Sequence, residues 1–162
     1  TPAEMTWQAG IDVLSLGGTK NGCLGVEGVV LFNPEKAWEL ELRRKRAGHL
    51  FSKHRYLAAQ MAAYLAEDLW LDLATQANRA ADRLAEGLRQ KSGVGLVQPV
   101  EANMVFARLP RSRHRDLLSA GAQYYLWDGT LDGGPEDEPL IGRLVCDWST
   151  RDDGIDGFLD RI

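Results

Sequence analysis

Two short apolar runs on either side of a glycine-rich loop restrict the fold of this chain more than any other feature. The first run is residues 11–16 (IDVLSL), and the second is residues 26–32 (VEGVVLF). Short runs that contain branched residues and end at glycine favour buried β-strands over helices. The loop between them, residues 17–25, contains four glycines, which let the backbone turn sharply and let another molecule approach it closely. We therefore expect two strands joined by a tight and accessible loop.

A long helical region is expected after the second run. Asn33 and Pro34 are typical of an N-cap and a first helical position, and Gly48 is the expected end of that helix. A second helix is expected from about residue 52, and a third over residues 70–91. Apolar residues recur along the third helix at intervals of three and four, which predicts one buried face. Those residues are Leu73, Ala77, Ala80, Ala81, Leu84 and Leu88.

The pattern changes near residue 92, where strand-like runs alternate with shorter helices. The elements expected there are strands at residues 94–97 and 104–109, a helix at 112–121, strands at 123–127 and 140–148, and a helix at 151–162. We therefore place a domain boundary at this point, with residues 1–91 in one domain and residues 92–162 in a smaller one. The order of the elements predicts the α/β class. Two strands need more covering layers than one helical hairpin supplies, so we expect upstream sequence to complete the first sheet.

The composition is that of a globular protein and argues against several classes of function. Apolar residues make up 44% and charged residues 26% of the 162 residues. The net charge of −4 gives none of the basic excess that is typical of nucleic-acid binding. No apolar run approaches the roughly 20 residues that cross a bilayer. Two cysteines, Cys23 and Cys146, are too few for a disulfide scaffold, so we expect a reducing compartment, the cytoplasm.

Lys20 has the most distinctive chemistry of the loop residues. It lies in the segment GGTKNG, residues 17–22, directly after the first predicted strand. Burial at the end of a strand disfavours the charged form of an amine and frees it to attack a carbonyl, as lysines that form Schiff bases do. A phosphate-binding loop needs the order GxxxxGK followed by Ser or Thr, which this segment lacks. An exposed turn lysine is the other interpretation that the motif allows.

The lysine segment and several later segments resemble the low-specificity L-threonine aldolases. The matching segments are DVLSLGGTKNG at residues 12–22, VEGVVLF at 26–32, AGHLFSKHRYLAA at 47–59, EANMVFA at 101–107 and IGRLV at 141–145. Enzymes of this family use pyridoxal 5′-phosphate (PLP), have the aspartate-aminotransferase-like fold type I, and are considerably longer than this chain. The resemblance implies that the chain is the C-terminal half of such an enzyme. It supplies the end of the PLP-binding large domain and the whole α+β small domain.

The resemblance also implies roles for four residues. Lys20 corresponds to the lysine that holds PLP covalently, and Thr19 to a neighbour that helps to hold the cofactor. Arg143 corresponds to the arginine that binds the substrate carboxylate, for which a guanidinium offers two parallel hydrogen bonds. Arg55 corresponds to the arginine that reaches the cofactor phosphate of a neighbouring subunit, which implies a homodimer or homotetramer with shared active sites. The alternatives are a turn hydroxyl for Thr19 and surface arginines for the other two, and no metal is implied.

The implied activity is cleavage of a threonine-like β-hydroxy-α-amino acid to glycine and an aldehyde. The alternatives are β-elimination or racemisation with the same cofactor, because a fold does not fix a reaction. A third possibility is an interaction module without a cofactor. We expect the 162 residues alone to be inactive, because the phosphate loop and the residues around the cofactor ring belong to the family's N-terminal half.

Two observations limit the assignment of further site residues. The histidines His49, His54 and His114 lie on no motif, and we assign the catalytic base to none of them. The family's late strand often continues into Thr-His, whereas this chain continues with Cys146 and Asp147. That departure leaves the aldehyde preference open.

Overall fold

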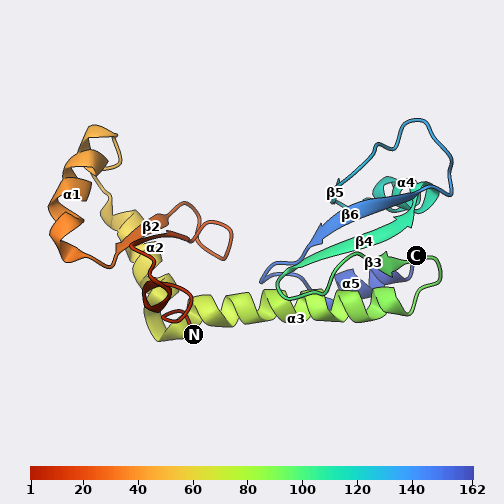
Figure 1. Ribbon diagram of the computed structural model, residues 1–162, viewed down its shortest axis with the longest axis horizontal. Helices are drawn as coiled ribbons and strands as arrows, with labels where there is room; N and C mark the ends of the chain where they lie inside the picture. The colour runs from red at the N-terminus through yellow and green to blue at the C-terminus, as the bar shows by residue number, and fades with distance from the viewer. The chain divides into compact units, whose positions relative to one another are not determined.

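The computed structural model describes all residues, 1–162. The chain divides into two compact units, Thr1–Trp70 and Leu71–Ile162. Each unit combines helices with antiparallel strands, which confirms the α/β class expected from the sequence (Figure 1). None of the helices has the combination of length and apolar content that crossing a bilayer requires.

A two-stranded antiparallel sheet carries the glycine-rich loop of the first unit. Strand β1 (Val13–Gly17) pairs with strand β2 (Glu27–Leu31), so that Val13 lies opposite Leu31 and Gly17 opposite Glu27. A single turn of 3-10 helix, η1 (Trp7–Ala9), precedes the sheet. Both strands were expected, and their ends agree with the expected ends to within two residues, the usual uncertainty of such boundaries.

The helices of the first unit begin and end close to the expected residues. They are η2 (Pro34–Lys36), α1 (Ala37–Arg46), α2 (Arg55–Leu65) and η3 (Ala66–Asp68). The Asn33 side chain accepts a hydrogen bond from the Glu35 N–H at 2.9 Å, which confirms the predicted N-cap. Gly48 has a φ of 78°, the left-handed conformation that commonly ends helices.

The burial expected for the first two strands is wrong within this chain. Val13 is 47% exposed and Val29 is 54% exposed, although both are apolar strand residues. A sheet buries its apolar side chains only where another layer covers it. The first unit supplies two strands and short helices, so most of its sheet surface faces solvent.

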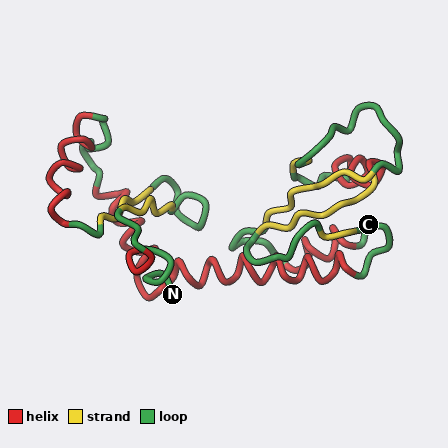
Figure 2. The backbone as a smooth tube through the Cα atoms, in the orientation of Figure 1, coloured by secondary structure: helices red, strands yellow, loops and turns green.

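The second unit is a four-stranded antiparallel sheet with a long helix. The helix α3 (Leu69–Arg89) is followed by β3 (Gly95–Leu96), β4 (Met104–Pro110), α4 (Arg111–Ser119), β5 (Tyr125–Leu126), β6 (Pro139–Val145) and α5 (Asp152–Leu159). The strand order is β3-β4-β6-β5. Figure 2 shows α3 and α5 running side by side along one face of this sheet. Arg83 of α3 forms an ion pair with Asp156 of α5 at 2.6 Å across that helix pair.

One hydrophobic core fills the space between the sheet and the helices of the second unit. Leu88 of α3, Val105 and Leu109 of β4 and Leu117 of α4 are completely buried in it. Strands β4 and β6 alternate between buried and more exposed residues, so each has one face on the core and one face turned away. The predicted apolar face of the third helix is confirmed for Ala77, Ala80, Ala81, Leu84 and Leu88.

The compact units divide at residues 70 and 71, whereas the sequence pattern changes near residue 92. The physical reason is that the apolar face of α3 packs into the core that β4 and β6 line. A helix is assigned to the unit in which its buried face lies, and the change in sequence periodicity marks only where strands begin. The assignment of residues 1–91 to a larger cofactor-binding domain stays a prediction.

His114 is a polar member of this core. It is completely buried on α4, and its two ring nitrogens lie 2.8 Å from the Tyr124 hydroxyl and 3.0 Å from the Leu140 carbonyl oxygen. Burial lowers the pKa of His114 below its ordinary value of 6.5, against the opposing effects of the Leu140 carbonyl and of Asp128. The histidine is therefore a structural residue that is buried in its neutral form.

The lowered pKa of His114 predicts that acid destabilises the second unit. The unfolded chain binds the proton more readily than the folded one, so this stabilisation is complete above about pH 6.5 and is lost as the pH falls toward the folded pKa. The free energy of unfolding, measured by urea titration between pH 7.5 and 5, should fall by at most about 1.4 kcal/mol per pH unit from this group. His114→Gln should weaken the dependence. Equal slopes for the wild type and His114→Gln would contradict this account.

Candidate active site

The turn after β1 is closed by backbone hydrogen bonds that begin at Gly18. The Gly18 N–H donates to the Val26 carbonyl oxygen at 3.1 Å. The Gly18 carbonyl oxygen in turn accepts from the N–H groups of Asn21 at 3.1 Å and Cys23 at 3.0 Å. Lys20 lies inside this closed turn, so its backbone position is fixed from both sides.

Gly18 occupies a position that only glycine fits. A β-carbon at this residue would lie 2.8 Å from the Val26 carbonyl oxygen and 3.0 Å from the Cys23 sulfur, closer than such atoms approach one another. Gly22 has a φ of 115°, a conformation that favours glycine strongly. Two of the four glycines of the loop are therefore explained by the shape of the turn itself.

Asn21 ties the turn to the helical part of the first unit. Its side-chain amide donates to the Tyr64 hydroxyl at 2.7 Å and to the Trp70 carbonyl oxygen at 3.1 Å. Tyr64 belongs to α2 and is only 4% exposed. The residue directly after the lysine is therefore held by a buried partner.

Gln60 of α2 makes a second attachment, on the far side of the turn. Its side-chain oxygen accepts from the N–H of Leu24 at 2.9 Å and from the N–H of Gly25 at 3.3 Å. Its side-chain nitrogen lies 3.4 Å from the Tyr56 carbonyl oxygen of the same helix and donates to it. That bond directs the Gln60 oxygen away from its own helix and toward the turn.

Lys20 itself is exposed, and no hydrogen bond or ion pair involves its amine. The expectation that this chain buries the lysine at a strand end is therefore wrong, because β1 is itself largely exposed. The turn holds the peptide of Lys20 in place while the amine stays free of any carboxylate. A primary amine that is exposed and forms no ion pair is accessible to a small aldehyde.

Thr19 and Arg55 make local contacts in the first unit. The Thr19 hydroxyl donates to the carboxylate of Glu27, across the β1–β2 pair. Arg55 begins α2, is exposed, and lies over the ring of Tyr56 with its guanidinium carbon 4.7 Å from the ring centre. Its guanidinium therefore keeps free donors that an anion can bind.

Arg143 lies in the second unit, on the face of the sheet turned away from the core. It pairs directly with Phe106 of β4 and with Tyr125 of β5, and its guanidinium carbon lies 5.7 Å from the centre of the Tyr125 ring. Its Nε is buried and has no hydrogen-bond partner. Trp127 packs edge-on against Phe106, with 5.2 Å between the ring centres. Two aromatic residues, Phe106 and Tyr125, therefore lie beside an arginine that has an unused donor.

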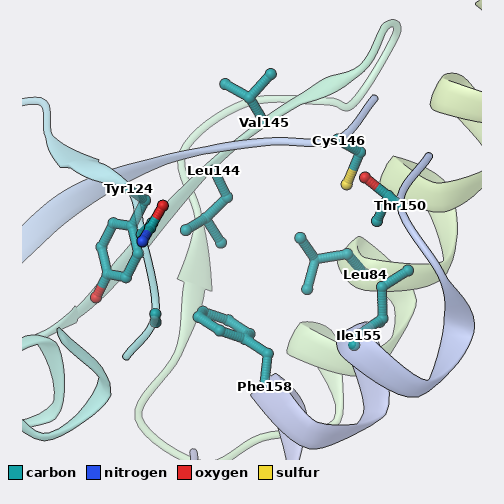
Figure 3. A pocket seen from close by; sticks show the side chains of 11 residues that line it. Leu84, Tyr124, Leu144, Val145, Cys146, Thr150, Ile155 and Phe158 are labelled. Atoms are coloured by element: carbon teal, nitrogen blue, oxygen red, sulfur yellow. The ribbon is translucent and has the colours of Figure 1, made fainter. Parts of the chain in front are cut away.

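The predicted site residues fall into two groups. Thr19, Lys20 and Arg55 belong to the first unit and Arg143 to the second, so neither unit alone contains all four. A hollow of about 160 Å³ in the second unit includes none of them; its lining is mostly apolar and includes Gln123, Cys146 and Thr150 (Figure 3). Cys146 is itself buried, and burial raises the pKa of its thiol to about 11, so this cysteine is a packing residue.

The three histidines differ in environment, and none forms a side-chain hydrogen bond with a predicted site residue. His114 is locked in the core, and His49 is exposed. His54 packs edge-on against Phe51 and has a buried Nδ1 without a partner. That none of the three histidines is the catalytic base stays a prediction.

Sequence reasoning missed the residues that hold the turn, namely Asn21, Gln60 and Tyr64. A signal for two of them was present. Gln60 and Tyr64 are four residues apart and therefore lie on one face of α2, and a glutamine on a face shared with a buried tyrosine needs a hydrogen-bond partner. What the sequence did not contain was the identity of that partner, which comes from a turn more than thirty residues upstream.

Comparison with known proteins connects this geometry to a family. Residues 1–111 match the model of the family described as beta-eliminating lyase. The chain is 42% identical over 150 residues to a low specificity L-threonine aldolase from Pseudomonas aeruginosa, covering 93% of this chain and 41% of that protein. A second relative, a low specificity L-threonine aldolase from Pseudomonas sp., is 40% identical over 152 residues, 94% of this chain and 41% of its own length.

The fold has a counterpart among solved structures. The threonine aldolase of Leishmania major matches with a TM-score of 0.79 and 24% identity, over 93% of this chain and 42% of that one. The chain thus spans about two fifths of the length of these proteins. The match of the family model covers more than half of the chain and includes the whole turn that carries Lys20. This chain therefore belongs to the beta-eliminating lyase family.

Proposed function

We propose that this chain is part of a PLP-dependent enzyme that cleaves threonine-like β-hydroxy-α-amino acids to glycine and an aldehyde. The observation that carries the proposal is the free amine of Lys20 on a turn closed at Gly18 and tied to α2. The names of two relatives at 42% and 40% identity support the reaction. The chain spans only part of those relatives, so the activity belongs to the full-length protein.

The residues present fit PLP. PLP has an aldehyde that reacts with a primary amine. The amine of Lys20 is exposed and forms no ion pair with a carboxylate, so it is available for this reaction. PLP also has a phosphate, for which the free donors of Arg55 are suitable partners, across a subunit boundary as the resemblance implies. When bound, PLP supplies an electron sink for the bond that is cleaved.

The chain's own residues would hold the cofactor and the substrate. Lys20 holds PLP at the β1 turn, and Thr19 supports that turn through its hydrogen bond to Glu27. Arg143 binds the substrate carboxylate with its guanidinium fork, which is kept on the outer face of the sheet by Phe106 and Tyr125. None of the three histidines is assigned the role of accepting the β-hydroxyl proton.

The assembly and location follow from the same proposal. A phosphate contact from Arg55 of a neighbouring subunit requires a homodimer or a homotetramer. The two cysteines are both unpaired in the structure, which is consistent with the cytoplasm. The 162 residues alone are proposed to be inactive, because Lys20 and Arg143 are only part of a complete site.

A second candidate function is β-elimination, which the description of the matching family favours. The two reactions use the same cofactor and the same carboxylate contact but break different bonds. Aldol cleavage breaks the Cα–Cβ bond and yields glycine and an aldehyde, whereas elimination of the β-hydroxyl yields ammonia and a keto acid. Analysis of the products formed from threonine by the full-length protein separates the two.

The role of Lys20 predicts where borohydride fixes the cofactor. Reduction of the full-length protein with bound PLP should leave a stable adduct on the peptide that contains Lys20, detected by mass spectrometry. Lys20→Ala should abolish the adduct and lower turnover at least 1,000-fold, on the order of the loss seen when an essential catalytic group is removed. Lys53→Ala, a change at another exposed lysine of the first unit, is the matched control and should keep the adduct. An adduct that persists in Lys20→Ala refutes the assignment.

The role of Arg143 predicts a loss of substrate binding. Arg143→Gln should raise KM roughly 30- to 150-fold, because a charge-assisted pair of hydrogen bonds contributes about 2–3 kcal/mol, and Arg143→Lys should recover only part of the lost binding. Arg108 is exposed on the same face of the sheet, so Arg108→Gln is the matched control. KM is measured for all three variants by steady-state kinetics of the full-length protein. An unchanged KM in Arg143→Gln would place the carboxylate elsewhere.

A further inference from the structure

We infer that Gln60 is a positioning residue that fixes the Lys20 turn for cofactor binding. This inference rests on the proposed role of Lys20. It concerns a residue that touches neither PLP nor substrate in the proposal and that acts only through the backbone of the turn. Its basis is the pair of hydrogen bonds from Leu24 and Gly25 to one side-chain oxygen.

The geometry gives Gln60 a specific orientation. Its side-chain nitrogen is occupied by the Tyr56 carbonyl oxygen, one helical turn earlier on α2. The oxygen is therefore the atom left for the turn, and it accepts two adjacent backbone N–H groups at 2.9 and 3.3 Å. Both halves of the amide are used, which fixes the rotamer of the side chain.

The position of these contacts along the turn explains what they restrain. Leu24 is 95% exposed, and Gly25 has no atom near the place where its β-carbon would be. This part of the turn therefore has little packing to hold it, and its two N–H groups are held by the bonds to Gln60. Asn21 holds the other side of the turn through Tyr64 and Trp70. Lys20 directly precedes Asn21, so the Asn21 bonds hold the turn next to the lysine. The Gln60 bonds hold the end of the turn at Leu24 and Gly25.

A restrained turn helps a covalent cofactor bind because less conformational freedom is lost when the bond forms. Without the bonds to Gln60, residues 22–25 gain freedom, and the amine of Lys20 spends less time in the geometry that the cofactor needs. The loss of two backbone hydrogen bonds should weaken cofactor binding about tenfold. The second unit should be unaffected, because its core does not involve Gln60.

The test compares variants of Gln60 in the full-length protein. Gln60→Leu keeps the size of the side chain and removes both acceptor and donor. Gln60→Glu keeps the acceptor oxygen for Leu24 and Gly25 and loses only the longer 3.4 Å bond to the Tyr56 carbonyl oxygen, so it should keep most of the wild-type affinity for PLP. Gln76→Leu makes the same chemical change at an exposed glutamine of α3 whose side chain forms no hydrogen bond within the chain. The dissociation constant for PLP is measured by titrating the apo-protein, and amide hydrogen exchange is measured at Leu24 and Gly25.

The inference predicts faster exchange at both amides and a dissociation constant about tenfold higher in Gln60→Leu. Gln60→Glu should lie near the wild type, and Gln76→Leu should match it. Wild-type PLP affinity in Gln60→Leu together with faster exchange would overturn the inference. If Gln60→Leu fails to fold, Gln60→Glu decides the question: near-wild-type exchange and affinity support the inference, and a loss as large as tenfold contradicts it. If the wild-type protein does not bind PLP through Lys20 at all, the proposed function has failed instead.

Discussion

The hydrogen bonds between the glycine-rich turn and α2 are the constraint on which the proposed site depends. A lysine in an exposed loop normally samples many positions, and its amine is rarely useful for covalent chemistry. Here the Gly18 carbonyl closes the turn, Asn21 attaches it to the buried Tyr64, and Gln60 holds Leu24 and Gly25. The backbone of Lys20 is therefore fixed although its side chain is free. This combination distinguishes the residue from an ordinary turn lysine.

The two units differ in how far their own residues stabilise them. The second unit has a closed core in which α3, β4 and β6 meet, with Leu88, Val105 and Leu109 completely buried. The first unit has one largely buried aromatic residue, Tyr64, and leaves apolar strand residues such as Val29 exposed. Tyr64 also accepts the hydrogen bond from Asn21. The few buried residues of this unit thus include the one that holds the lysine turn, Tyr64.

The sequence predicted the elements well because local patterns determine them. The glycine-bounded runs produced β1 and β2, and the spacing of Ala77, Leu84 and Leu88 predicted the buried face of α3. Burial of Lys20 was predicted wrongly, because burial depends on covering layers that a local pattern does not specify. Gln60 was missed for a related reason: its partners are distant in sequence, and a lone glutamine on a helix gives no sign of which backbone it binds. The pairing of Arg143 with Phe106 and Tyr125 likewise required the strand register.

The central claim is that the amine of Lys20 is the group to which the cofactor attaches. A crystal structure of the full-length protein grown with PLP tests it most directly. Continuous electron density from the Nζ of Lys20 to the aldehyde carbon of the cofactor is the predicted result, with the turn attached to Gln60 and Tyr64 as described above. An Nζ that points into bulk solvent, with PLP bound elsewhere or absent at saturating concentration, would contradict the account.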